Sequence, residues 1–415
     1  MKGTVRFFGV ISFMLLFSTL SQAQYLWNSD SAFKAGRPNS GRIWGYTFGD
    51  YYYKGHSDTL NRGGSNQYTG IPEGRNEFQM RRIYLGYDYN ISKKFSAELL
   101  LAAEDNITTG SGTTSGDLLA DNKLAFYVKL ANIRWKNIWN GTDLAVGQVA
   151  TPGFSLLEDK IWNYRPIERN VIDIRRTPSY DLGATLQGKF DPAKGNYGYD
   201  LMVGNGTSAR PENDNFKWVY GDVYAYFFKR RLVVDVYADY ERLNWTPSWH
   251  HSRQMIKAYV AYSFPSANNP DTSAFTIGVE GYINNLKNDG FATKISGGTD
   301  TLTVQAKGIS VYVHGNIVPN KLRFFARYDA YNPSNKIDNN VYASYKGNTS
   351  NYNDPVTKEQ FITAGLDYTP VKKVHFMPNI WYNSYKYQGP DEGANTPYNS
   401  HDLVYRLTFY FIFGK

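Results

Sequence analysis

Apolar and polar residues alternate along much of the chain with a period of two. Within 231–241, for example, Leu232, Val234 and Val236 fall on one face and Asp235 falls on the other. Alternation sustained over such a length is typical of a β-strand with one apolar face. Similar segments recur up to the C-terminus, so the pattern predicts an all-β protein.

Sixteen segments of this kind follow residue 40, each bounded by polar or turn-forming residues. They cover 41–52, 77–90, 94–105, 124–136, 142–151, 180–190, 197–205, 217–228, 231–241, 254–264, 274–284, 308–317, 321–331, 359–368, 374–387 and 402–413. Around Leu130 and Ala131 the apolar set changes face, which indicates a β-bulge.

The connections between these segments alternate in length. Those after even-numbered segments are short, whereas most of those after odd-numbered segments are long and polar, such as 53–76, 106–123, 152–179, 285–307 and 332–358. Short turns on one rim, long loops on the other and an even strand count are the layout of an outer-membrane β-barrel. Lipid offers no partner for an unpaired backbone group, so such a sheet must close on itself. We therefore predict a transmembrane antiparallel β-barrel of 16 strands over residues 41–415, with a lumen wide enough for water.

Composition excludes several other classes of protein. The mean hydropathy is −0.50 and only the N-terminus holds a long apolar run, which excludes a polytopic helical membrane protein. The absence of cysteine excludes a disulfide-stapled scaffold, and 16% aromatic residues argue against disorder. Aromatic residues gather at strand ends on the short-turn side, as in the girdles at membrane interfaces; examples are Tyr87, Trp135, Trp139 and Tyr368.

The N-terminus has the pattern of a secretory signal peptide. Lys2 and Arg6 precede an apolar run over 7–20, and small residues at Ser21 and Ala23 predict cleavage before residue 24. We expect residues 1–23 to be a signal peptide and 24–40 a lead-in segment; a retained N-terminal anchor is the alternative. Cleavage would lower the formal net charge from +8 to about +6.

The connection 152–179 differs from the other long loops because it is rich in large apolar residues, among them Trp162 and Ile167. A solvent-exposed loop has no reason to hold so much apolar surface, so we predict that it folds into the barrel as a constriction loop. Ser155 and Glu158 have the spacing of a capping box that opens a short helix. The charged residues predicted to line the constriction are Lys160, Arg165, Arg169, Arg175, Arg176, Glu158, Glu168 and Asp173. Alternatively, some of these charges pair with one another and only fix the loop.

Strand parity also predicts which charges face the lumen, since a Lys or Arg facing lipid at mid-depth costs roughly 2–4 kcal/mol. The basic wall residues predicted in this way are Arg82, Arg231, Lys257, Arg323, Arg327 and Arg406, and the acidic ones include Asp235, Asp239, Glu280, Asp329 and Asp367. Both signs line the wall, and the positive surplus of the chain favours anions.

Two short stretches resemble one known family. The first runs from Thr151-Pro152 through Glu158 and Glu168-Arg169 to Gly183, and the second contains Arg81-Arg82. They are similar to the constriction region and the paired arginines of the phosphate-selective porin family. That resemblance implies a homotrimeric, water-filled, anion-preferring channel in the bacterial outer membrane, with phosphate as a candidate solute.

Other functions find little support in the sequence. The six histidines have no companion nucleophile or metal-binding motif, so we predict no catalytic residue, no metal and no cofactor. No basic recognition element indicates nucleic-acid binding. The expected partners are small anionic or polar solutes, outer-membrane lipid and two further copies of the chain. A structural or adhesion barrel with a closed lumen is the alternative function.

Overall fold

The computed structural model describes residues 33–63, 66–104, 119–120, 123–155, 158–169, 178–212, 214–246, 249–267, 273–347 and 355–414. The predicted signal peptide over 1–23 and the constriction residues Asp173, Arg175 and Arg176 lie outside these ranges. They remain predictions.

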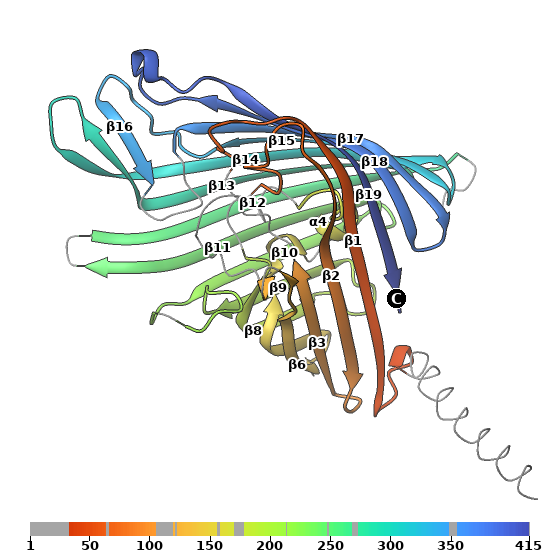
Figure 1. Cartoon of the computed structure of the whole chain (residues 1–415). Helices are drawn as coiled ribbons and strands as arrows, with labels where there is room; N and C mark the ends of the chain where they lie inside the picture. The colour runs from red at the N-terminus through yellow and green to blue at the C-terminus, as the bar shows by residue number, and fades with distance from the viewer. Residues whose placement is uncertain are drawn as a thin grey trace, which may run out of the picture.

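Sixteen antiparallel strands form a closed barrel (Figure 1). They are β1 (Ser40–His56), β2 (Asn76–Asn90), β3 (Phe95–Glu104), β6 (Tyr127–Trp139), β7 (Thr142–Ala150), β8 (Tyr180–Lys189), β9 (Tyr197–Gly204), β10 (Trp218–Phe227), β11 (Leu232–Thr246), β12 (Trp249–Pro265), β13 (Ser273–Lys294), β14 (Thr299–Val318), β15 (Leu322–Asn332), β17 (Thr357–Val371), β18 (Val374–Tyr387) and β19 (Ser400–Phe413). The ring closes where β1 pairs with β19, with Gly45 opposite Phe413. The prediction of a 16-stranded all-β barrel is confirmed.

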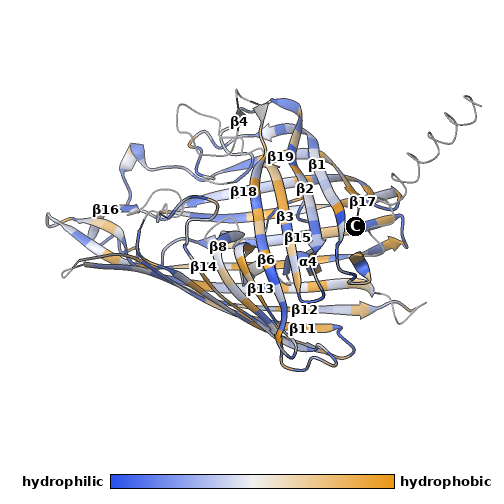
Figure 2. Cartoon of the chain, turned by 90° about the horizontal axis from the view of Figure 1, so that it is seen from below, coloured by the Kyte–Doolittle hydropathy of each residue, from blue (hydrophilic) through white to orange (hydrophobic). Residues whose placement is uncertain are grey.

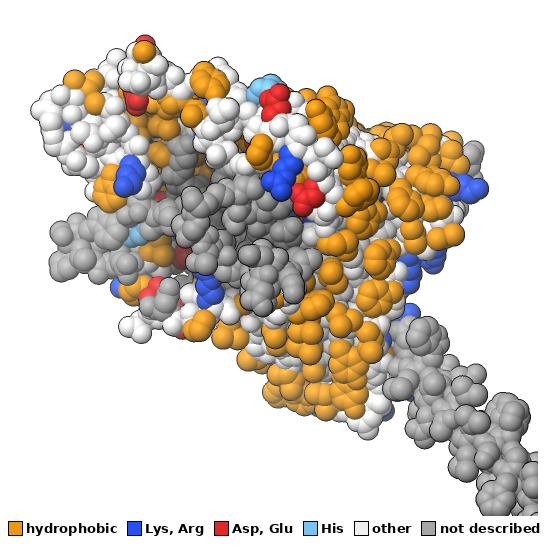
Figure 3. Space-filling model, in the orientation of Figure 1, with side chains coloured by type: hydrophobic (Ala, Val, Ile, Leu, Met, Phe, Trp, Pro, Cys, Tyr) orange, Lys and Arg blue, Asp and Glu red, His pale blue; other side chains and the backbone are white. Residues whose placement is uncertain are grey.

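Exposure along each strand alternates in the sense expected for a barrel in lipid. On β12, Ile256 is 62% exposed on the outer face, while its neighbour Lys257 is fully buried inside. On β11, Val236 is 50% exposed and Asp235 is 2% exposed. Figure 2 shows the resulting change of hydropathy from residue to residue along the strands, and Figure 3 shows apolar side chains gathered over the outer wall. An apolar exterior with charges inside is the reverse of a soluble protein.

The two rims differ, as predicted. The prediction that 285–307 and 332–358 are loops is wrong, however, because both contain strands. Residues 285–307 are not a loop, because β13 and β14 continue as a paired hairpin beyond the barrel wall, with Thr293 opposite Thr299. The connection 332–358 contains a further strand, β16 (Tyr342–Gly347), which pairs with the outer end of β13. Alternating Thr, Val and Phe residues there favour strand over loop, and Figure 1 shows this extension projecting from the barrel.

β-Bulges on β2 and β6, the strands on either side of β3, interrupt the alternation there. Across β1 and β2 the register passes from Arg82 to Met80, which leaves Arg81 as the extra residue. Across β3 and β6 it passes from Leu130 to Val128, which leaves Lys129 as the extra residue. A bulge re-aims a side chain, so each of these two positions adds a buried basic residue to the interior. The bulge predicted near residue 130 is confirmed.

The remaining elements are short. Strands β4 (Leu119–Ala120) and β5 (Lys123–Leu124) form a separate hairpin, and η1 (Gly393–Asn395) is a single helical turn. Within the described ranges, every helix is too short or too polar to cross a membrane.

Candidate functional site: the barrel constriction

The connection between β7 and β8 turns into the barrel. Its described part contains two short helices, α3 (Pro152–Ser155) and α4 (Glu158–Trp162), followed by residues 163–169. Trp162 and Ile167 are 1% and 0% exposed and pack against side chains of β11, β12, β14, β15 and β18. The predicted inward-folded loop after the fifth strand is confirmed, and its large apolar residues form a core with the inner wall.

The short helix predicted here corresponds to α4, and a second helix, α3, precedes it, beginning at Pro152 and ending at Ser155. The capping role of Ser155 stays a prediction. Proline favours the first position of a helix, where its missing N–H costs nothing.

Three arginines from three strands hold the segment 166–169 by its backbone. Arg81 of β2 donates to the first of the four carbonyl oxygens, and Arg406 of β19 donates to the second at 2.9 Å. Arg327 of β15 donates to the third and fourth, at 3.3 and 2.7 Å. All three side chains are almost fully buried. Arg327 and Arg406 therefore lie inside the barrel, as parity predicted, but several of their donors bind the loop.

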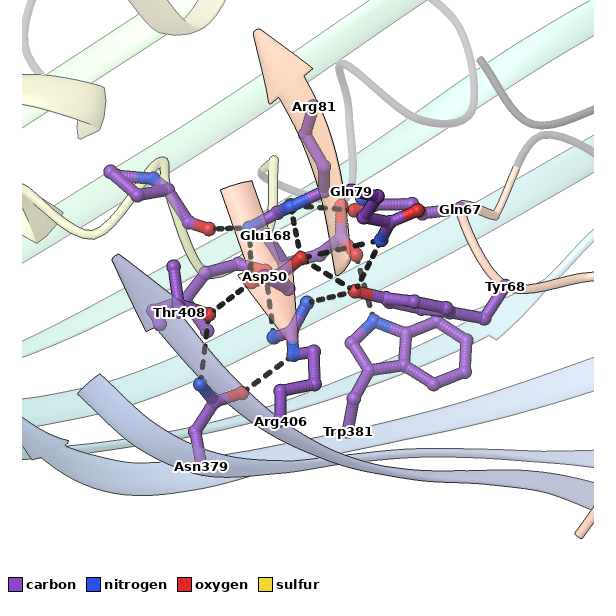
Figure 4. Close-up of polar contacts among 12 residues, drawn as sticks. Asp50, Gln67, Tyr68, Gln79, Arg81, Glu168, Asn379, Trp381, Arg406 and Thr408 are labelled. Carbon is purple, nitrogen blue, oxygen red and sulfur yellow. Dashed lines mark hydrogen bonds and ion pairs between the residues drawn. The ribbon is translucent and has the colours of Figure 1, made fainter. Parts of the chain in front are cut away.

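Asp50 of β1 is the centre of the polar network drawn in Figure 4. Its carboxylate forms an ion pair with Arg81 and accepts hydrogen bonds from Tyr68 at 2.8 Å and from Thr408 at 2.5 Å. Asp50 is fully buried. Charged hydrogen bonds of this kind make a buried carboxylate tolerable, so the network fixes Arg81 where it meets the constriction loop.

A second loop also enters the barrel. In the connection between β1 and β2, Tyr68 and Ile71 are 0% and 1% exposed and pack against Trp381 and Val404. Lys54 donates to the Tyr68 carbonyl oxygen at 2.8 Å. The polar composition of this connection predicts an ordinary loop on the rim, so the inward course is a correction to that prediction. Two large apolar residues in an otherwise polar stretch were the available signal.

An acidic cluster lies where α4 meets the wall. Lys257 of β12 is 3.2 Å from Asp235 and 3.6 Å from Glu158, and the carboxyls of Glu280 and Asp222 are close enough to interact with it electrostatically. All five side chains are 2% exposed or less. Burial and the adjacent Glu280 carboxyl raise the pKa of Glu158, whereas Lys257 opposes that rise. Four buried carboxyls around one lysine cannot all be ionised at little cost.

A basic cluster lies on the β2–β3–β6 wall. Glu104 is 3.1 Å from Arg82 and 2.5 Å from Lys129, and it accepts a hydrogen bond from Tyr84. Arg165 of the constriction loop is close enough to interact electrostatically with both cations. The bulge at position 129 is the local feature that brings this lysine inside. Strand parity predicts Arg82 on the lumen wall but does not predict Lys129 there.

The charges of the constriction loop itself are sorted by exposure. Glu158 and Glu168 are buried against the wall, whereas Lys160 is exposed and Arg165 and Arg169 are half-buried. Arg165 also forms an ion pair of 2.5 Å within the loop, with Asp159. In this part of the loop the three basic side chains and Asp159 keep contact with solvent, and the two glutamates do not.

The remaining wall candidates lie toward the short-turn rim. Arg323 is half-buried on β15, where its guanidinium meets the His314 ring nitrogen at 2.9 Å. Arg231 was predicted to lie on the lumen wall, but it lies in the turn before β11 and is a rim residue. Among the described residues, no three His, Asp or Glu side chains converge as metal ligands do.

Comparisons with known proteins give structural likeness alone. No protein-family profile matches the sequence, and no curated protein matches it either. The outer-membrane channel DcaP of Acinetobacter baumannii superposes with a TM-score of 0.58 at 12% identity, covering 91% of this chain and 98% of the other. The chain has a porin fold.

Two further solved structures agree. The anion-selective porin from Comamonas acidovorans gives a TM-score of 0.53 at 10% identity, covering 90% of this chain and 100% of the other. OmpT of Vibrio cholerae, in its trimer form, gives 0.51 at 11% identity, covering 91% and 100%. These matches support the porin-type barrel implied by the sequence resemblance, and this fold is that of bacterial outer-membrane proteins.

Proposed function

We propose that the protein is a bacterial outer-membrane porin, through which small solutes diffuse past the constriction loop with a preference for anions. The proposal rests on one observation, the loop that enters a 16-stranded barrel and is fixed to its wall. A barrel of this width leaves a wide hole unless something folds inside. A fixed inner loop narrows the hole and lets its side chains choose among solutes.

The sorting of charges on that loop supports the preference for anions. Lys160, Arg165 and Arg169 keep solvent contact and only Asp159 opposes them there, while Glu158 and Glu168 face the wall. Basic side chains at a constriction favour anions, and arginine in particular suits phosphate. Phosphate is therefore the first solute to test. The chain is also similar in fold to a porin from Comamonas acidovorans that is described as anion-selective, which supports this proposal.

We also propose a homotrimer, on the resemblance found in the sequence and the trimer form of the similar Vibrio cholerae protein. Chemical cross-linking in outer-membrane vesicles followed by electrophoresis without heating would test the oligomeric state. A ladder that ends at three copies is the expected result, and a single band of one copy would contradict it.

A barrel with a closed lumen is the second candidate, and one observation favours it. Two loops enter the interior, and Tyr68 of one and Ile167 of the other are fully buried there. Such packing serves a plug as well as a constriction. The barrel would then support adhesion or envelope structure through its long loops.

Conductance separates the two candidates. The folded protein in a planar bilayer under a KCl gradient should give stable steps with an anion-favouring reversal potential, and phosphate should then be titrated against the chloride current. Changing Lys160, Arg165 and Arg169 to Gln should shift the reversal potential toward cations, whereas Lys287→Gln, Lys336→Gln and Lys346→Gln, at exposed positions, should not. No conductance from a folded barrel would contradict the channel and favour the closed barrel.

A further inference from the structure

Most of the chain's positive surplus lies in its short turns. The seven connections 91–94, 140–141, 190–196, 228–231, 266–272, 319–321 and 372–373 join each even barrel strand to the next. They contain nine basic residues, Lys93, Lys94, Lys194, Lys229, Arg230, Arg231, Lys321, Lys372 and Lys373, but only two acidic ones, Asp191 and Asp271. That difference is close to the formal net charge of +8 for the whole chain.

The positive surplus of the chain lies at one rim, so it does not support the predicted preference for anions in the lumen. The interior holds both signs in comparable clusters, such as Glu104 with Arg82 and Lys129, and Glu280 with Lys257. The basic turns therefore call for an explanation of their own.

Seven of the nine cations of the short-turn rim are exposed, Arg231 and Lys373 are half-buried, and exposed apolar side chains lie beside them. Lys229, Arg230 and Lys372 are exposed, and next to them Phe228 is 70% exposed and Val371 is 61% exposed. In Figure 3, Lys and Arg side chains lie along the right-hand edge of the apolar surface. Apolar and aromatic side chains at a barrel rim mark the level of lipid headgroups, so these cations lie at that level too.

The turn between β10 and β11 has large side chains at positions where the backbone conformation favours glycine. Phe228, Lys229 and Arg230 have φ of 52°, 57° and 66°, the left-handed region. Glycine or asparagine adopts this region at lower cost, and Asn320 does so in another short turn. Strain of this kind persists where the side chains serve a purpose.

We propose that the short-turn rim binds anionic phospholipid, with its lysines and arginines on headgroup phosphates and its outward apolar residues among the acyl chains. The inference rests on the membrane placement that the proposed function assumes. Cations clustered next to a membrane-embedded segment attract anionic lipid, and each one near the surface adds to the affinity. Phosphate oxygens suit both arginine and lysine. The long-loop rim has mixed charge and is not part of this site.

Lipid binding to the detergent-solubilised folded protein, measured by native mass spectrometry, tests the proposal. Phosphatidylglycerol and phosphatidylcholine with identical acyl chains are titrated in parallel. We expect the protein to prefer phosphatidylglycerol by roughly tenfold or more. The variant with Lys229, Arg230, Lys372 and Lys373 changed to Gln should lose most of that preference. Equal binding of the two lipids by the unchanged protein would overturn the proposal.

A matched control removes the same charge elsewhere. Changing Lys287, Lys307, Lys336 and Lys346 to Gln removes four exposed cations from the opposite half of the molecule, and should leave the lipid preference unchanged. An equal loss in this control would overturn the assignment to the short-turn rim. Excess inorganic phosphate should not displace the lipid; displacement would assign the site to a free anion.

Conductance of the same preparations keeps the two proposals apart. If the protein does not conduct but prefers phosphatidylglycerol, the channel proposal fails and the lipid site stands. If it conducts without lipid preference, the lipid site fails and the channel stands.

Discussion

Trp381 of β18 donates its indole N–H to Glu168 of the constriction loop, with Nε1 2.7 Å from Oε2. Its ring also lies edge-on to Tyr68 of the β1–β2 loop, with the ring centroids 5.4 Å apart. One buried side chain thus contacts both loops that enter the barrel. Because the two loops share this wall contact, a substitution in one loop should alter the position of the other.

Replacing Trp381 with Phe should loosen the constriction loop while keeping an aromatic ring in the core. The change leaves a buried Glu168 oxygen without its donor, which costs about 1–3 kcal/mol. We expect noisier single-channel current and a lower unfolding temperature. Trp135→Phe is the control, since that side chain is 44% exposed on the outer face. Equal noise in both variants would contradict the role of this hydrogen bond.

Replacing Arg327 with Met should destabilise the barrel more than any neutral substitution at the same depth. Arg327 is 2.5 Å from Asp329 and also holds two carbonyl oxygens of the loop. Its removal leaves a buried carboxylate uncompensated, at a cost of about 3–5 kcal/mol. Urea unfolding, monitored by the difference in electrophoretic mobility between folded and heated protein, measures this loss of stability.

A double variant identifies the source of that loss. Arg327→Met together with Asp329→Leu should recover much of the stability, because no unpaired charge then remains. The loop should still be loose, since its two backbone contacts are gone. Failure to recover would show that packing at Arg327, and not the charge, accounts for the cost.

The barrel was predictable because side chains that face lipid must be apolar, which produces the alternation seen in the sequence. Every outward residue between the girdles must be apolar. In strands such as 231–241 the alternation therefore shows which residues face lipid and which face the lumen. The rule stops where the wall leaves the membrane, which is why the extension of β13 and β14 was missed. There the exposed positions are polar, as at Lys287 and Thr303, so outward apolar residues no longer mark the strands.

The site was less predictable because two β-bulges turn basic side chains into the barrel, against the simple alternation. Arg81 and Arg82 are adjacent, yet both point inward, and simple alternation assigns only one of them to the lumen. Lys129 enters the interior in the same way. Which lumen charges bind the loop and which face solvent depends on contacts between strands far apart in sequence, such as Arg406 with residue 167.

Glycine opposite tyrosine on the inner wall should be required at specific positions. A Cβ at Gly308 would collide with the Tyr282 ring on the neighbouring strand, whereas a Cβ at Gly281 would meet nothing within 4 Å. Gly308→Ala should therefore destabilise the barrel by about 1–3 kcal/mol, and Gly281→Ala should be neutral. Unfolding temperatures measured in one lipid would show the difference. Equal temperatures for the two variants would mean that the Tyr282 ring moves aside freely.

Docking of the constriction loop should weaken as the pH rises, because burial and Glu280 raise the pKa of Glu158 in the folded protein. For a group whose folded pKa is raised, the stability it contributes is complete below the unfolded pKa, about 4.3 for Glu. That stability is lost as the pH rises through the folded pKa. Glu158→Gln keeps the shape and cannot ionise, so the variant should lose this part of the pH dependence and be the more stable protein at alkaline pH.

Unfolding temperature against pH, compared between the unchanged protein and Glu158→Gln, measures the effect. Glu73→Gln, at an exposed position of the β1–β2 loop, is the matched control and should follow the unchanged protein. The same comparison in single-channel recordings should show noise that grows with pH in the unchanged protein and stays level in Glu158→Gln. Parallel curves for all three proteins would mean that Glu158 stays ionised beside Lys257 over the whole pH range.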